Sequence, residues 1–243
     1  MKNYHPMASF DAEAAEIYDD AARGDEADAV AFLQEAAAGR RALELAIGTG
    51  RIGLPLSAAG VAVDGIDLSE PMIAKLRSKP GGDAIAVTMG NFAGVPVDGR
   101  YGLIYLVFNT FYNLLTQDEQ VRCFESVAAH LEDDGVFVVE AAIPSYVYGL
   151  KNNQHVEATT VGVDQVWLDV GTYDPVTQLH EETHVRLMRD SVRLFPIVCR
   201  YVWPSEMDLM ARLAGLRLRD RWGGWNREPF TAASRLHVSV YGR

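Results

Sequence analysis

The sequence predicts an α/β fold built on a doubly wound, mostly parallel sheet, with N-terminal helices and an antiparallel β insertion after the fifth strand. Between residues 42 and 143, short apolar runs alternate with helical stretches, as in βαβ units. From residue 155 to residue 202 apolar and polar residues alternate with period two, which is typical of half-buried antiparallel strands. A glycine-rich turn follows the first apolar run, where such sheets bind ligands.

The first part of the chain predicts helices followed by parallel strands. One or two helices are expected between Phe10 and Ala38, where apolar side chains recur at helical spacing and Gly39 closes the segment. Five short apolar runs predict the parallel strands, at 42–47, 61–66, 84–88, 103–108 and 136–143.

The helices between and after these strands are marked by their first residues. Ser69 followed by Pro71 starts one helix, and Thr116 with Glu119 three residues later is a capping box for the next. Pro204 opens a helix after the insertion, and two closing strands are expected at 216–222 and 236–241. We interpret residues 1–243 as one domain, with 1–38 as an N-terminal helical lid and 150–203 as the antiparallel β insertion, expected to cover the substrate.

Composition and charge exclude several classes of protein. The 243 residues are 49% hydrophobic and 23% charged, as in ordinary globular chains. The 33 acidic and 22 basic residues give a net charge of −11, which disfavours binding to a phosphate backbone. Two cysteines cannot build a disulfide framework, and no apolar run resembles a signal peptide or a membrane span. We therefore expect a cytoplasmic protein with a small-molecule partner, no nucleic acid and no membrane, whose oligomeric state stays open.

The sharpest motif runs from Leu43 to Gly53, at the end of the first strand and the start of a helix. Its glycines let a ligand approach the backbone, and the helix N-terminus offers unpaired N–H groups. Asp67 ends the second apolar run, where a carboxylate can accept two hydrogen bonds from a ribose diol. The spacing of Gly48, Gly50 and Gly53 alone also fits a dinucleotide-binding turn, so an NAD(P)-dependent oxidoreductase stays open on this motif.

Two motifs in order resemble those of the class I, Rossmann-like, S-adenosylmethionine-dependent methyltransferases. The first is Glu44-x-Ala46-x-Gly48-x-Gly50, with alanine in place of the family's first glycine. The second is the run from Asp67 to Met72, which reads Asp-Leu-Ser-Glu-Pro-Met. A dinucleotide-binding strand would normally carry an apolar residue at the place of Glu44. The resemblance spans about residues 10–140 and returns in the closing helix and strands.

The resemblance implies S-adenosyl-L-methionine as the cofactor and assigns residues to it. Asp67 would hold the ribose, so its loss should weaken cofactor binding while leaving the empty fold nearly unchanged. An aromatic side chain near the N-terminus would close over the cofactor, and Asn91, in place of the family's aspartate, would accept from the adenine amino group. The expected cofactor residues are Tyr18, Glu44, Ala46, Gly48, Gly50, Asp67, Leu68, Met72, Asn91, Phe92 and Phe108.

The implied reaction moves a methyl group to a nitrogen, oxygen or carbon nucleophile on a small molecule, chiefly by holding donor and acceptor together. A base is needed only when the acceptor must lose a proton; the candidates are Tyr112, His155, His180 and His184. Tyr112 belongs to an Asn-x-x-Tyr spacing that resembles the motif of methyltransferases acting on exocyclic amino groups, without its two prolines. A non-catalytic cofactor-binding relative is the remaining alternative.

One motif competes with this interpretation. The run from His180 to His184 reads H-E-x-x-H, the zinc-peptidase pattern, which needs a helix to bring both histidines to one metal. The segment alternates as a strand does, and four residues of a strand span about 13 Å, so we predict no metal site. His180, Glu182 and His184 would share one strand face, either in solvent or lining the substrate pocket.

Overall fold

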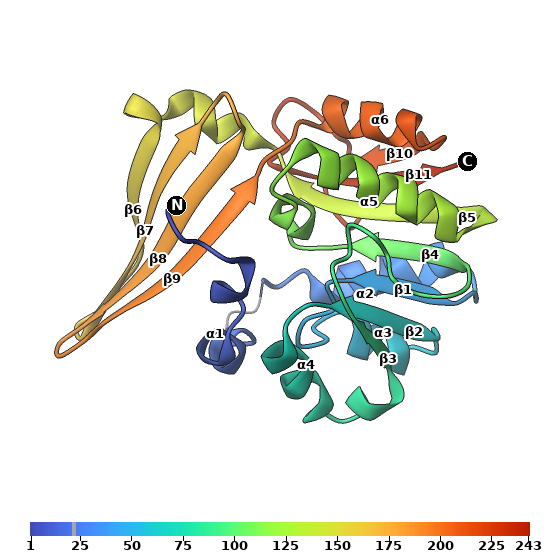
Figure 1. Ribbon diagram of the computed structural model, residues 1–243, viewed down its shortest axis with the longest axis horizontal. Coiled ribbons are helices and arrows are strands. Elements are labelled where there is room, and N and C mark those ends of the chain that lie inside the picture. The colour runs from blue at the N-terminus through green and yellow to red at the C-terminus, as the bar shows by residue number, and fades with distance from the viewer. Residues whose placement is uncertain (21–22) are drawn as a thin grey trace.

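The computed structural model describes residues 1–20 and 23–243 and contains a seven-stranded and a four-stranded sheet (Figure 1). The larger sheet consists of β1 (Ala42–Leu45), β2 (Val63–Asp67), β3 (Ala86–Met89), β4 (Tyr101–Leu106), β5 (Leu131–Ala142), β10 (Arg217–Trp222) and β11 (Leu236–Gly242). Its order is β10-β11-β5-β4-β1-β2-β3, with β1 to β5 parallel and β10 and β11 antiparallel. The chain changes direction across the sheet at β1, which leaves a crevice at the carboxyl ends of β1 and β4.

Helices cover both faces of this sheet. On one face α2 (Glu26–Ala37) and α3 (Gly53–Ala58) bury Phe32, Leu33 and Leu56 against side chains of β4. On the other, α5 (Gln117–His130) and α6 (Pro204–Leu213) lie side by side, and Phe124 packs edge-on against Phe137 of β5 with ring centroids 5.3 Å apart. In the described part of the chain no helix has both the length and the apolar character needed to cross a bilayer.

The capping residues begin the helices where the sequence predicts. Ser69 precedes α4 (Glu70–Arg77), and its side chain accepts the Met72 N–H at 3.2 Å. Thr116 and Glu119 form the complete capping box of α5. Both predictions are confirmed, because a cap satisfies local backbone donors and depends little on the rest of the fold.

The antiparallel insertion after β5 forms the four-stranded sheet, which confirms the predicted fold class. It consists of β6 (Gln154–Val161), β7 (Gln165–Asp174), β8 (Leu179–Met188) and β9 (Val192–Arg200), paired in chain order. The short 3-10 helices η4 (Pro144–Gly149) and η5 (Lys151–Asn153) lead into it. In Figure 1 this sheet, yellow to orange, stands beside the carboxyl ends of the parallel strands.

The N-terminal segment joins the two sheets. It contains the 3-10 helix η1 (Pro6–Ala8) and α1 (Ala12–Ile17), which contact β9 and α4, respectively (Figure 1). The Ser9 hydroxyl donates to the Pro196 carbonyl at 2.7 Å, and the Phe10 carbonyl accepts from the Ser69 hydroxyl at 2.6 Å. The first 20 residues therefore bridge the space between the insertion and α4.

Two features differ from the sequence-based expectations. β5 begins at Leu131 and runs through the predicted Asp-Asp-Gly turn, because pairing with β4 continues across a register irregularity between Tyr101 and Leu103. The expected lid over residues 1–38 divides into two parts. α2 belongs to the sheet-covering layer, since its apolar side chains are buried there, and only the segment before it reaches the crevice.

Candidate functional site

A cavity of about 780 Å³ lies where the parallel strands, the N-terminal segment and the four-stranded sheet meet. Its volume falls within the range of ligand pockets, about 300–1,000 Å³. Ala46 and Gly48 follow β1, Asp67 ends β2, and Asn91 follows β3 in lining one side. The inner face of the insertion lines the other side. The cavity therefore extends from the glycine-rich loop to the insertion.

The loop after β1 turns in left-handed backbone conformations. Ala46 has φ 55°, Gly48 φ 56° and Gly50 φ 78°. A side chain at Gly48 would meet no atom within 4 Å, so the backbone is open on that side to a ligand. Ala46, which stands in place of the family's first glycine, is in a conformation that favours glycine.

Asp67 holds this loop against the end of β2. Its two carboxylate oxygens accept from the Gly48 N–H at 2.6 Å and from the Ser69 N–H at 2.8 Å. The side chain is buried, and burial raises the pKa of this carboxyl while the backbone hydrogen bonds oppose the rise. A carboxylate offers about four acceptor positions, so Asp67 can still receive hydroxyl donors from a ligand in the cavity.

Glu44 and Gly50 lie outside the cavity lining, in contrast to the expectation that both contact the cofactor. Glu44 is 2% exposed, and its Oε2 accepts from the Tyr105 hydroxyl at 3.0 Å. Burial raises the pKa of Glu44 to about 8, although the Tyr105 hydrogen bond opposes this. Gly50 faces Leu54 and Leu76, whose carbons would lie 2.9 and 3.0 Å from an added Cβ. Glu44 thus supports the loop from beneath.

The remaining expected cofactor residues lie together around the cavity. Asn91 uses its side-chain oxygen to accept the Ala93 N–H at 2.9 Å, which keeps one lone pair of that oxygen for a ligand. Leu68 is exposed whereas Met72 is buried. The members that line the cavity are Tyr18, Ala46, Gly48, Asp67, Leu68, Met72, Asn91, Phe92 and Phe108.

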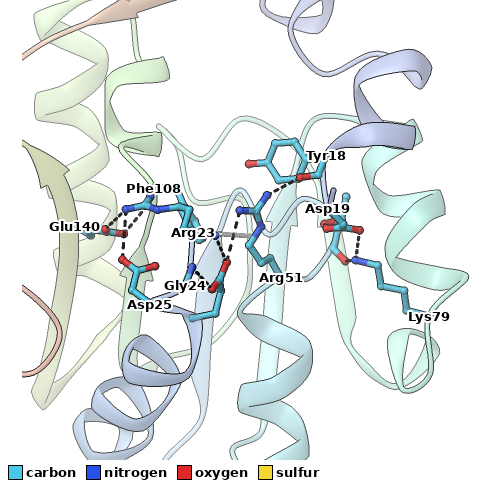
Figure 2. A network of polar contacts seen from close by, with 11 residues as sticks. Tyr18, Asp19, Arg23, Gly24, Asp25, Arg51, Lys79, Phe108 and Glu140 are labelled. Atoms are coloured by element: carbon cyan, nitrogen blue, oxygen red, sulfur yellow. Dashed lines mark hydrogen bonds and ion pairs between the residues drawn. The ribbon is translucent and has the colours of Figure 1, made fainter. Parts of the chain in front are cut away.

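A network of polar contacts fixes the N-terminal segment beside this cavity (Figure 2). Arg51 donates to the Tyr18 carbonyl at 2.6 Å, and its guanidinium lies 4.8 Å from the centroid of the Tyr18 ring. Lys79 pairs with Asp19 at 2.6 Å and also donates to the Thr49 carbonyl at 2.7 Å. We call Asp19, Arg51 and Lys79 the clasp. It couples the position of Tyr18 to the glycine-rich loop.

The loop after β4 is held in a strained conformation. Phe108 and Asn109 have φ 59° and 61°, which is uncommon for residues other than glycine and recurs at functional sites. Glu140 accepts the Phe108 N–H at 2.8 Å, and the Asn109 side chain accepts the Ala142 N–H at 2.5 Å. The Arg23 guanidinium pairs with Glu140 at 2.7 Å (Figure 2). These bonds hold the Phe108 ring at the cavity.

Tyr112, the candidate base of this loop, lines the cavity but uses its hydroxyl elsewhere. The hydroxyl donates to the Ala142 carbonyl at 2.6 Å and lies 3.1 Å from the Val202 carbonyl. Because its hydroxyl is engaged by these backbone carbonyls, Tyr112 fits a structural role. The Asn-x-x-Tyr spacing therefore ties the loop to the end of β5.

The three candidate histidines converge around Glu182, which the sequence placed on the same strand face as His180 and His184. Glu182 Oε2 lies 2.9 Å from His180 Nε2 and 3.3 Å from His155 Nε2. Its other oxygen lies 3.5 Å from His184 Nε2, and His184 Nδ1 lies 2.7 Å from Asp169 Oδ1. We call these five residues the histidine–carboxylate cluster. All of them line the cavity.

Charge around Glu182 favours its ionised form. Burial raises the pKa of the Glu182 carboxyl, but its contact with His180 and its attraction to the imidazoles in their protonated form outweigh burial, so the pKa lies below its usual value. The 2.9 Å contact lacks hydrogen-bond geometry, which leaves His180 Nε2 and His155 Nδ1 buried without hydrogen-bond partners in the described part of the chain. Such atoms can accept a donor from a ligand in the cavity.

The H-E-x-x-H run lies entirely in β8, so its predicted strand conformation is confirmed. His180 and His184 belong to two different groups of potential metal ligands, each completed by a residue from a neighbouring strand. His155 of β6 joins His180 and Glu182, whereas Asp169 of β7 joins Glu182 and His184. A metal-free site remains our prediction. Strand alternation placed three of these residues on one face, but no pattern in the sequence indicated that residues of β6 and β7 complete the cluster.

Comparison with known proteins indicates what this chain is similar to. A family described as "Methyltransferase domain" matches residues 42–135. The structure of the CcbJ methyltransferase from Streptomyces caelestis is 36% identical, covers 98% of this chain and 99% of that one, and superposes with a TM-score of 0.92. A cypemycin N-terminal methyltransferase from a Streptomyces species is 26% identical over 84% of both chains. A dTDP-3-amino-3,6-dideoxy-alpha-D-glucopyranose N,N-dimethyltransferase from Streptomyces fradiae is 29% identical over 56% of this chain and 55% of that protein.

Proposed function

Because this chain belongs to the class I S-adenosylmethionine-dependent methyltransferases, we propose that its acceptor is an amine and that the methyl group goes to nitrogen. The family assignment and the cofactor supersede the NAD(P)-dependent alternative, for which the relatives give no support. What remains to be proposed is where the cofactor lies, which acceptor is used, and where the protein works.

We place the cofactor at the glycine-rich loop. Gly48 offers an open backbone, and Asp67 retains acceptor positions toward the cavity, so both fit a ribose and an amino-acid tail. Phe92 and Met72 supply apolar surface for the adenine, and Tyr18 covers the site from the N-terminal segment. When bound, S-adenosylmethionine supplies an electrophilic methyl group that the acceptor's lone pair displaces from sulfur.

The single observation that supports an amine as the acceptor is the charge of the residues that line the cavity. Among the described residues that line it, none is lysine or arginine, whereas five are carboxylates: Asp67, Glu119, Glu157, Asp169 and Glu182. Such a lining attracts a cation. An aliphatic amine arrives as an ammonium ion, and two relatives are named as methyltransferases of amino groups.

We also propose that the protein acts in the cytoplasm on a free small molecule. Both cysteines are unpaired, which suits a reducing compartment, and the net charge of −11 opposes a nucleic-acid acceptor.

The test is a panel of acceptors with matched skeletons. The purified protein is incubated with S-adenosylmethionine and benzylamine, N-methylbenzylamine, benzyl alcohol, phenol or benzoic acid, and mass spectrometry follows methylated product and demethylated cofactor. We expect methylation of the amines alone. Methylation confined to an oxygen or carbon acceptor would overturn the proposal.

A further inference from the structure

We infer that Glu182 binds the protonated nitrogen of the acceptor and that His180 accepts its proton. The inference rests on the proposed function and deepens it, because it assigns the amine a binding group and a base. The residues concerned lie on the inner face of the four-stranded sheet, apart from the cofactor motifs of the parallel sheet.

The cluster is built around a glycine. Gly171 of β7 pairs with His155 on β6 and with Glu182 on β8, so the three positions form one row across the sheet. A Cβ at Gly171 would lie 2.4 Å from His155 Cε1 and 2.7 Å from His180 Nε2. The missing side chain is therefore what lets the two imidazoles converge on Glu182.

The orientation of His180 suits a proton acceptor. Its ring stacks on Tyr173 with centroids 3.9 Å apart and planes 9° apart, which fixes its plane. Its Nε2 is buried, has no hydrogen-bond partner in the described residues, and lies 2.9 Å from Glu182 Oε2. An ammonium group on this oxygen would therefore be within reach of an unoccupied imidazole nitrogen.

The proton moves from the substrate nitrogen to an imidazole of the cluster. One N–H bond of the ammonium ion breaks, its electron pair stays on nitrogen, and the proton forms a new N–H bond at His180 Nε2. The positive charge moves from substrate to imidazole and remains beside the Glu182 carboxylate. His184, 39% exposed and paired with Asp169, provides a route for the proton toward solvent.

Titratable groups from every strand of the insertion face Glu182 and influence the ionisation of its carboxyl. They are His155 and Glu157 on β6, Asp169 and Tyr173 on β7, His180 and His184 on β8, and Cys199 on β9. Cys199 is neutral near neutral pH, because burial and the Glu182 charge raise the pKa of its thiol to about 12.

The variants separate binding from proton transfer. Glu182→Gln removes the charge, His180→Gln keeps a polar group but cannot take the proton, and Gly171→Ala drives the imidazoles apart. Glu181→Gln is the matched control, since Glu181 lies on the other face of β8 and pairs with the Met1 amino group. Cofactor binding, measured by calorimetry, should be equal in all four variants and reports that the fold is intact.

Binding is measured first, without turnover. Benzylamine is titrated into protein saturated with the demethylated cofactor. Glu182→Gln should weaken its binding about tenfold or more, because a charge-assisted hydrogen bond is lost, and Glu181→Gln should not. Benzyl alcohol should show no such difference. Equal benzylamine affinities in wild type and Glu182→Gln would overturn the assignment of Glu182.

Turnover then tests His180. With benzylamine at neutral pH, His180→Gln should lower kcat about a hundredfold with little change in KM, and the deficit should shrink as pH approaches the amine's own pKa. With a β-fluorinated amine that is neutral at the same pH, the variant should match wild type. An equal loss of kcat with both amines would mean that His180 has a structural role only.

Two outcomes distinguish this inference from the proposed function. If wild type methylates only alcohols or phenols, the proposed function itself fails. If wild type methylates amines and the variants match it, this inference alone fails.

Discussion

Replacing Asp67 by asparagine tests whether the glycine-rich loop is the cofactor site. The carboxylate accepts from two backbone N–H groups, of Gly48 and Ser69, at 2.6 and 2.8 Å. An amide can accept through its oxygen only, so one of these buried donors would face an NH2 group instead. In contrast to the expectation from the sequence, we therefore predict that the empty fold also depends on Asp67, because the carboxylate is part of the loop.

The size of both effects follows from these bonds. An unsatisfied buried donor costs about 1–3 kcal/mol, and each kcal/mol lowers the melting temperature of a domain of this size by about 2–4 °C. Losing a charge-assisted hydrogen bond to the cofactor ribose costs about 1.5–3 kcal/mol, which weakens cofactor binding by roughly ten- to a hundredfold or more. We expect both losses in Asp67→Asn.

Calorimetry with S-adenosylmethionine and thermal melting with and without it measure the two effects. Asp64→Asn is the control for cofactor affinity, since Asp64 lies on the same strand but outside the cavity, where it contacts Arg41 and Tyr101. Because burial raises the pKa of Asp67, wild-type cofactor affinity should fall with decreasing pH earlier than for an exposed aspartate, and the variant should lack this fall. A lowered melting temperature with unchanged affinity would show that Asp67 is structural and the cofactor lies elsewhere.

Three further predictions concern the support of the site and its metal content. Burial raises the pKa of Glu44 to about 8, so the folded state favours the protonated carboxyl. As pH rises from about 5 to about 9, the free energy of unfolding of wild type, measured in urea, should therefore fall by up to about 4 kcal/mol relative to that of Glu44→Gln. The same pH dependence of stability in both proteins would contradict this. Lys79→Met removes the partly exposed ion pair with Asp19 and the hydrogen bond to the Thr49 carbonyl, so it should weaken cofactor binding by no more than about fivefold and reduce the salt dependence of that binding. An unchanged salt dependence would show that the clasp does not contribute to cofactor binding. Protein prepared without added metal should contain no stoichiometric zinc by mass spectrometry, and zinc that is lost in His180→Ala would refute the metal-free site.

Local sequence patterns predicted most of the helices and strands, because these patterns reflect interactions between residues that are close in the chain. The caps at Ser69 and Thr116 satisfy nearby backbone donors, and the alternation over β8 follows from a strand with two unlike faces. The order of the Gly48 and Asp67 motifs indicated the family and predicted that the cofactor site lies at the carboxyl edge of the sheet. The same reasoning placed Glu44 in the cofactor site, since a one-dimensional motif does not show that β1 is buried on both sides.

The sequence by itself determined the fold class, the family and the edge at which the cofactor motifs lie, because periodicity, caps and short motifs are fixed by residues close in the chain. Tertiary structure alone decided which distant residues meet. His155, Asp169 and Glu182 come from three strands and converge only through the register across Gly171. Arg51 and Lys79 reach the N-terminal segment only because the loop after β1 and the end of α4 bring them beside it. Register and packing depend on the whole sheet, and no local pattern contains them.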